Sequence, residues 1–379
     1  MSAIADRFGM AMERVRTYDR TLIVIALVLF AAGILFSMAA SPAATARIRI
    51  EEAFYFAARQ AAYAALGLLV MMSAAALEPK QVRRAGTILL ALCLPLAALA
   101  ALFGTEIKGA QRWFDFGLFS FQPSEILKPA LIVVWAWMLS ESMKQPKFPG
   151  RLVSLGLMAL AAAALLAQPD VGQTALLLIC LAPMLMLSGI ALRYLLGGGA
   201  LAALGAWAIY SFYPHARERV DTWLNPEGDA AYQVNRALDA IAAGGVFGRG
   251  PGEGVIKRSL PDAHADFVFA VAAEEFGLIA SLGLIAVFFV LAFRGLSRAS
   301  RLNDGFEQLA AAGLVTLLVA QAAIHIGVNL SLLPAKGMTL PFISFGGSSM
   351  IGSALAFGFC LSLLRDRPGA YLTPLRRNY

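Results

Sequence analysis

An abrupt change from polar to apolar residues, within 257–293, decides the fold of this chain. The sequence there is KRSLPDAHADFVFAVAAEEFGLIASLGLIAVFFVLAF, in which a long polar segment ends and an apolar window begins at Phe267. An apolar run of this length crosses the hydrocarbon core of a bilayer as a helix. Asp266 is therefore expected at the edge of a membrane, beside His264, Lys257 and Arg258. A charge at that depth is costly to hold without a purpose, so Asp266 is the first candidate for proton transfer on a lipid-borne substrate.

Similar apolar windows recur along the whole chain. Of its 379 residues, 59% are hydrophobic and 15% are charged, whereas soluble domains carry about 25% charged residues. These numbers predict an all-α, polytopic integral membrane protein whose helices pack into one domain, 21–364, between a cytoplasmic head, 1–20, and a cytoplasmic tail, 365–379. The ten predicted transmembrane helices are 21–38, 54–77, 85–103, 123–139, 152–167, 174–190, 194–213, 267–293, 306–330 and 346–364.

The basic residues of the loops predict the orientation of the chain. If the N-terminus lies inside, the cytoplasmic segments carry a clear excess of Lys and Arg over the short outer loops. Both termini are therefore predicted to be cytoplasmic, and the long loop 214–266, between the seventh and eighth helices, to be periplasmic. The net charge of +7 follows from this topology and from contact with anionic membrane lipid, so no nucleic acid is implied as a partner. Cys93, Cys180 and Cys360 lie in apolar windows without paired spacing and imply no disulfide or metal site.

The segment 109–128 brings an arginine, a tryptophan and an ion pair near one interface. Glu125 and Lys128 lie three residues apart and so share a helix face. One interpretation assigns Trp113 to the aromatic belt of the membrane and the ion pair to structure. The other assigns Arg112 to a phosphate or sugar, because a planar guanidinium matches phosphate oxygens. Spacing does not decide between them.

Two sets of polar residues lie inside predicted helices. Arg59 is within the second window, where a charge must be paired, hydrated or extended to the interface. Gln321, His325 and Asn329 recur at every fourth residue of the ninth window and form one polar stripe, with Lys336 just beyond it. The stripe either bonds helices together or lines a groove for a substrate.

The long outer loop is a usual place for function. Within it, a helical pattern at 231–243 is followed by GGVFGRGPG at 244–252. This spacing resembles phosphate-binding turns, but no strand precedes it, so close backbone packing against the membrane surface is the favoured interpretation. Glu274 and Glu275, deeper on the eighth window, point to different sides of a regular helix, so one is expected to serve structure and the other to face a cavity.

The order of these motifs resembles the SEDS family of bacterial membrane proteins, named for shape, elongation, division and sporulation. The resemblance spans nearly the whole chain and is carried by four separated motifs. These are GAQRW at 109–113, QPSE at 122–125 together with Lys128, the segment 260–275, and KGMTLPFISFGGSS at 336–349. Residues 336–341 and 262–264 favour the division branch of the family, with the elongation branch as the alternative.

The resemblance implies a glycosyltransferase that polymerises lipid II, an undecaprenyl-pyrophosphate-linked disaccharide peptide, into peptidoglycan strands. It places the enzyme in the bacterial inner membrane at the division septum, with a class B penicillin-binding protein of the FtsI type and other division proteins as partners. It also implies that Asp266 is essential. The alternatives are a lipid II flippase, which would need polar groups through the full membrane depth, and a noncatalytic scaffold for division enzymes.

Glycan extension needs a base for the acceptor hydroxyl and cations for the leaving pyrophosphate. Asp266 is the predicted base. No cofactor is implied, and the sequence leaves open whether a divalent cation such as Mg²⁺ sits with Asp266. The candidate substrate-binding residues are Arg112, Lys128, Lys257, Arg258, Lys336, Gln111, Trp113, Arg59 and His325.

Overall fold

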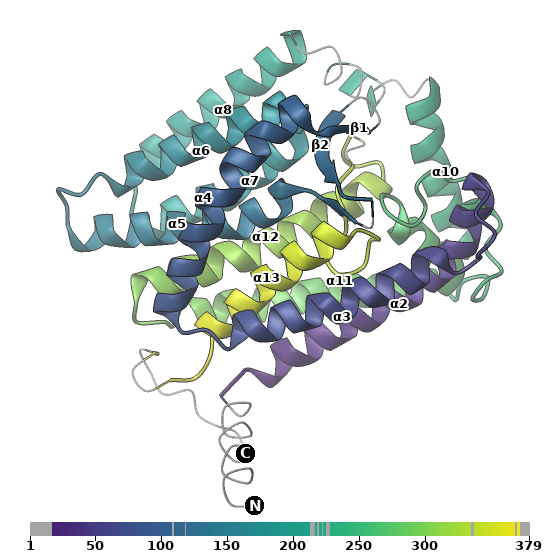
Figure 1. Cartoon of the computed structure of the whole chain (residues 1–379), viewed down its shortest axis with the longest axis horizontal. Coiled ribbons are helices and arrows are strands. Elements are labelled where there is room, and N and C mark those ends of the chain that lie inside the picture. Colours follow the sequence, from purple (N-terminus) through teal and green to yellow (C-terminus); the bar gives the residue numbers. More distant parts are fainter. Residues whose placement is uncertain are drawn as a thin grey trace, which may run out of the picture.

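The computed structural model describes residues 17–107, 110–117, 119–212, 217, 220–221, 223–224, 228–334, 337–367 and 370–371. These residues form a helical bundle with one small sheet (Figure 1). Its helices are α2 (Arg20–Ile48), α3 (Tyr55–Ala75), α4 (Pro79–Phe103), α5 (Pro123–Lys144), α6 (Gly150–Ala167), α7 (Val171–Leu187), α8 (Leu192–Phe212), α10 (Gly228–Gly244), α11 (Val268–Ala299), α12 (Gly305–Asn329) and α13 (Gly347–Leu363), with a 3₁₀ turn, η1, at Ile256–Arg258.

Each of the ten predicted apolar windows coincides with a helix, which confirms the all-α membrane fold. Eight of these helices are long and apolar enough to cross a bilayer. The other two, α7 and α13, have 17 residues each and so extend about 25 Å, slightly less than a typical hydrocarbon core. The number of membrane crossings, the side of the termini and the boundaries of the head and tail stay predictions.

The centre of the bundle is formed by α5, α12 and α13, and α13 runs between α12 and α3 (Figure 1). Small residues let these helices approach closely. A Cβ atom on Gly352 of α13 would lie 2.6 Å from the carbonyl oxygen of Glu125 in α5. On the other side of α13, a Cβ on Gly358 would lie 2.5 Å from the carbonyl oxygen of Met71 in α3. The two glycines therefore fix α13 between its neighbours.

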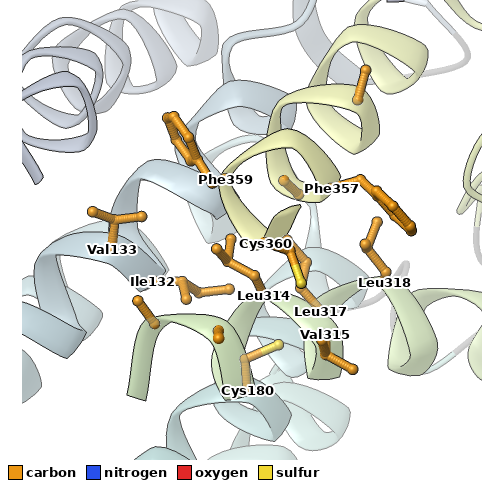
Figure 2. Packing of buried hydrophobic residues seen from close by; sticks show 14 of the residues in the cluster. Ile132, Val133, Cys180, Leu314, Val315, Leu317, Leu318, Phe357, Phe359 and Cys360 are labelled. Carbon is orange, nitrogen blue, oxygen red and sulfur yellow. The ribbon is translucent and has the colours of Figure 1, made fainter. Parts of the chain in front are cut away.

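An apolar cluster fills the space between α5, α7, α12 and α13. Figure 2 shows Ile132, Leu314 and Cys360 within this cluster, with Cys180 below them. Cys93, Cys180 and Cys360 are all free and buried, so each of them packs as a small apolar side chain.

The loop after α4 forms a three-stranded antiparallel sheet that the sequence did not predict. Its strands are β1 (Thr105–Ile107), β2 (Ala110–Asp115) and β3 (Ser120–Phe121), in the order β1-β2-β3. The turn after β2 needs Gly117, whose φ of 79° favours glycine, and the Asp115 side chain accepts a hydrogen bond from Gly117 N at 2.8 Å. Strands this short produce no long apolar or alternating pattern in the sequence, which explains why they were not predicted.

Helix α8 differs from the others because none of its residues is buried. Large apolar side chains such as Leu201, Trp207 and Phe212 are exposed along it. A helix that is apolar on all sides and carries no buried residue is expected to contact lipid or another transmembrane helix.

Helix α11 is broken at Gly277, where φ is 78° and ψ is −174°. The regular helix assumed for the eighth window is therefore wrong at this residue. The glycine-rich segment 244–252 packs against the break, and its backbone bonds to groups that the break leaves free. Arg249 N donates to Glu274 O at 2.9 Å, and Leu278 N donates to Gly245 O at 2.9 Å. The segment packs closely through its backbone, but its partner is helix α11 and not the membrane surface that the sequence analysis favoured.

Candidate active site

Asp266 lies in a turn that leads directly into α11, and its side chain is half-buried. The turn is closed by Asp266 N, which donates to Asp262 O at 3.0 Å. Asn329, at the end of α12, holds it from the other side. Its Nδ2 donates to Asp266 O at 3.1 Å, and its Oδ1 accepts from Ala270 N at 3.2 Å. Asp266 is thus fixed at the junction of the long loop with α11 and α12.

The segment 337–345, which precedes α13, forms the opposite side of this site. Phe345 N donates to His264 O at 2.9 Å, and Ser344 Oγ donates to Ala265 O at 2.7 Å. The Asp266 carboxylate faces the start of this segment, since a Cβ on Gly337 would lie 3.6 Å from Asp266 Oδ2. Glycine at 337 therefore leaves space beside the carboxylate that a larger residue would fill.

Two residues of α3 support this site and were missed by the sequence analysis. The ring of Phe56 stacks on His264 with centroids 4.1 Å apart. Gln60 is fully buried and its Nε2 donates to Ile343 O at 3.3 Å. A glutamine inside an apolar window is a signal that could have identified Gln60, whereas Phe56 resembles any other apolar residue of its window.

A chain of buried polar residues crosses the bundle behind Asp266. Lys128 Nζ lies 2.9 Å from Glu125 Oε2 and donates to Gln321 Oε1 at 3.0 Å. Glu125 Oε1 accepts from Gln173 Nε2 at 3.1 Å. This series of hydrogen bonds ends at Thr339, whose carbonyl oxygen accepts from Gln321 Nε2 at 2.9 Å. The predicted ion pair of Glu125 and Lys128 is present, and Lys128, 2% exposed, is enclosed by protein.

The polar stripe on α12 bonds the bundle together. Gln321 contacts α5 and Thr339, His325 Nδ1 hydrogen-bonds with Met338 O at 2.7 Å, and Asn329 holds the Asp266 turn. His325 is only 1% exposed, and its Nε2 has no partner among the residues that the structure describes. The helix-bonding interpretation of the stripe therefore agrees with the contacts, and His325 is not open to a ligand.

Arg112, on β2, anchors the small sheet to the turn between α6 and α7. Its Nε donates to Gln168 O at 2.9 Å, and its Nη2 donates to Pro169 O at 2.7 Å. Its Nη1 lies 3.6 Å from Asp170 Oδ2. Burial raises the pKa of the Asp170 carboxyl, although Arg112 acts in the opposite direction. Asp170 also caps α7 by accepting from Gln173 N at 3.3 Å.

The guanidinium of Arg112 is thus largely used by protein groups, and this favours its structural interpretation. Gln111 and Trp113, beside it on β2, are half-buried. Both belong to the strand that lies at the end of α4, so they share its attachment to the bundle.

The structure corrects the expectation that Lys257 presents its charge to a substrate. Lys257 is 3% exposed, its ammonium is bonded to the Glu275 carboxylate, and it donates to Ala39 O at 2.9 Å. Glu274 accepts three backbone N–H groups, from Val255 at 2.8 Å, Ile256 at 2.8 Å and Lys257 at 2.9 Å. Both glutamates therefore hold the long loop on α11, so the prediction that one faces a cavity was wrong.

The remaining candidate cations differ in position. Arg59 is exposed on α3, with its guanidinium carbon 4.7 Å from the ring centroid of Tyr55. Arg258 is exposed at the end of η1. Lys336 lies outside the described residues. Within the described part of the chain, no three His, Cys, Asp or Glu residues gather in a group that could hold a metal ion.

Comparisons with known proteins agree with this architecture. The model of the FtsW, RodA and SpoVE family, described as cell cycle protein, matches residues 19–368. The chain is 45% identical over 355 residues to a probable peptidoglycan glycosyltransferase FtsW of Caulobacter vibrioides, covering 94% of this chain and 91% of that protein. It is 31% identical to stage V sporulation protein E of Bacillus subtilis, covering 92% and 97% of the two chains.

Two solved structures share the fold. One belongs to a study of how a peptidoglycan synthase complex coordinates polymerization and crosslinking. It has a TM-score of 0.77, 30% identity, and coverage of 92% of this chain and 98% of that chain. The other is the rod shape determining protein RodA of Thermus thermophilus, with a TM-score of 0.69, 28% identity, and coverage of 92% and 97%.

Proposed function

This chain belongs to the family of the cell cycle proteins FtsW, RodA and SpoVE, and we propose that it is a peptidoglycan glycosyltransferase that polymerises lipid II. The motifs at 109–113, 122–128, 260–275 and 336–349 predicted this family, and the prediction is confirmed. The observation that carries the proposal is the position of Asp266. Its backbone is fixed by α12 and its neighbours by the segment before α13, while its half-buried carboxylate faces the space at Gly337.

In the proposed reaction, Asp266 acts as the general base. The acceptor sugar hydroxyl attacks the anomeric carbon of the donor, and its proton passes to the Asp266 carboxylate. The new glycosidic C–O bond forms as the bond from the anomeric carbon to the pyrophosphate breaks. The undecaprenyl pyrophosphate leaves with the electron pair of that bond.

The leaving pyrophosphate needs nearby cations. Among the candidates, Lys336 precedes Gly337 in the sequence and Arg59 is exposed on α3, beside the helix face that carries Gln60. These two are proposed to meet the substrate directly. Lys128, Lys257 and Arg112 are proposed to act as positioning residues, because their charges are engaged by protein groups. We expect that any divalent cation in the reaction arrives with the substrate pyrophosphate.

The relatives support a proposal for the partner and the place of action. A similar solved structure comes from a complex that couples polymerization with crosslinking, so a class B penicillin-binding protein is the proposed partner. The identity of 45% to a protein named FtsW, against 28% to RodA, favours the division branch. We therefore propose that the chain acts with other division proteins at the septum, in the bacterial inner membrane.

Strand synthesis by purified protein tests this function. The wild-type chain with its crosslinking partner should convert lipid II into long glycan on a gel, and Asp266→Asn should lower the yield by about a hundredfold or more, as expected for loss of a general base. Asp262→Asn is a matched control, because it removes an acid four residues earlier in the same turn. Unchanged synthesis by Asp266→Asn would exclude the proposed role of Asp266. Lipid II movement across vesicles without synthesis would favour the flippase.

A further inference from the structure

A cavity of about 450 Å³ lies between the last turns of α2 and the segment around η1. One wall is apolar and consists of Pro42, Ala43 and Ala46 from α2. Two arginines, Arg47 and Arg258, line it from opposite elements. Nothing in the sequence indicated that Arg47 and Arg258 lie close together, because they are far apart along the chain.

The two guanidinium groups give the cavity a positive charge. Arg47 Nη1 donates to Ser259 O at 3.1 Å, which keeps it beside Arg258. Neither arginine forms an ion pair with an acid in the described part of the chain. Lys257 also lines the cavity, but its charge is offset by Glu275. Two guanidinium groups without an ion-pair partner among the described residues favour an anion in this cavity, and their planar donor groups match phosphate oxygens.

The surroundings of the cavity indicate that this anion belongs to a lipid. The adjoining loop exposes Val246 by 52%, Phe247 by 80% and Val255 by 56%. Exposed apolar side chains in one short loop are expected to lie in the membrane interface. Arg47 lies in the last turn of α2, beyond the predicted transmembrane window 21–38, so it is expected outside the hydrocarbon core, where lipid head groups lie. The apolar wall below it would suit the carbon chain next to a phosphate.

We propose that this cavity binds the phosphate ester of a membrane lipid. Arg47 and Arg258 hold the phosphate oxygens, and the first carbons of the lipid lie along Pro42, Ala43 and Ala46. Bilayer phospholipids such as phosphatidylglycerol and the polyprenyl carrier undecaprenyl phosphate share this chemistry. The lining residues do not include Asp266, Asn329 or Gly337, so this site is separate from the proposed active site and does not depend on the proposed function. A bound lipid would join α2 to the loop that ends at Asp266.

Lipid titration of the full-length protein tests the proposal. The purified chain in detergent is titrated with phosphatidylglycerol, undecaprenyl phosphate and inorganic pyrophosphate, and bound molecules are counted by native mass spectrometry. The double variant Arg47→Gln/Arg258→Gln should bind one lipid fewer at low concentration, with an affinity about tenfold lower or more. Ala46→Trp should have the same effect, because it fills the cavity and keeps both charges. Arg49→Gln, which removes an exposed arginine outside the cavity, should bind like wild type.

Each outcome has a fixed meaning. Loss of phosphatidylglycerol alone identifies a bilayer phospholipid as the occupant, and loss of undecaprenyl phosphate alone identifies the polyprenyl carrier. Wild-type lipid binding by the double variant would overturn the proposal, as would a loss in the double variant that Ala46→Trp does not reproduce. Pyrophosphate binding as tight as lipid binding would overturn the assignment to a lipid. Unfolding temperatures of the variants show whether the fold is kept.

Discussion

At the scale of single residues, Lys257 and Arg258 show how tertiary context separates two neighbouring charges. Both are basic and adjacent, yet Lys257 is buried against Glu275 and Arg258 is exposed. A buried ion pair is weak evidence for stability, but removal of one partner leaves a buried charge without compensation. The pair therefore serves to fix the loop 245–258 on α11 in one position.

Lys257→Met is expected to destabilise the protein by about 3–5 kcal/mol, because Glu275 loses its partner. Lys257→Met combined with Glu275→Gln should recover a large part of this loss, since the amide side chain is neutral and its oxygen can still accept the hydrogen bond from Gly252 N. Arg258→Met, the exposed neighbour, should change stability by less than about 0.5 kcal/mol. Thermal unfolding in detergent measures all three. An equal loss in the single and double variants would contradict this account of the pair.

Asp19, just before α2, provides a pH-dependent contact. Burial raises the pKa of its carboxyl, but Arg294 and Arg298 outweigh burial and hold that pKa below its usual value of 3.8. A lowered pKa in the folded state contributes stability that is present above the unfolded pKa and is lost as pH falls through the folded pKa. The unfolding temperature of the wild type should therefore fall below about pH 4. In Asp19→Asn, it should be lower at neutral pH and depend less on acid.

At the scale of elements, the break in α11 decides how the long loop is attached. At Gly277 the backbone has a φ of 78°, and a Cβ would lie 2.3 Å from Gly248 N. The adjacent loop supplies backbone partners on both sides of the break, at Arg249 N, Gly250 N, Gly245 O and Val246 O. The break therefore couples α11 to the same loop that leads to Asp266.

Gly277→Ala should destabilise the protein by about 1–3 kcal/mol or more, because alanine is strained at this φ and its Cβ collides with the loop. Gly283→Ala, in the same helix, meets nothing within 4 Å and should be neutral or stabilising by up to about 1 kcal/mol. Limited proteolysis of the loop, together with unfolding temperature, compares the two variants. If both behave alike, the break is not the point of attachment.

At the scale of the whole molecule, long sequence patterns predicted structure and short ones did not. Long apolar windows predicted ten of the eleven helices that the described residues form, because burial in lipid imposes composition directly. Polar residues inside windows, such as Lys128 and Asn329, correctly indicated places where helices meet. The small sheet at 105–121 and the kink at Gly277 depend on local backbone geometry that composition does not encode. The burial of Lys257 could not be predicted either, because a lysine can be exposed or buried and its residue type does not decide which.

The predicted orientation can be tested across the whole chain by labelling. Cys93, Cys180 and Cys360 are at most 4% exposed, so the wild-type chain should not react with a membrane-impermeant maleimide. Glu253→Cys, exposed in the long loop, should react from outside intact cells whose outer membrane is permeable. Lys80→Cys, at the start of α4, should react only after lysis. The reverse pattern would place Asp266 in the cytoplasm and remove the basis of the proposed function.

The contacts of Arg298 have a consequence for how the protein is made. Its guanidinium bonds to Asp19 before α2 and to Leu364 O, Asp366 and Tyr371 after α13. The ribosome synthesises Asp19 long before residues 364–371. A nascent chain that has just inserted α11 can therefore bond Arg298 only to Asp19. Helix α2 is thus secured through Arg298 by residues that are translated much later, so these contacts can be completed only after residues 364–371 have been synthesised.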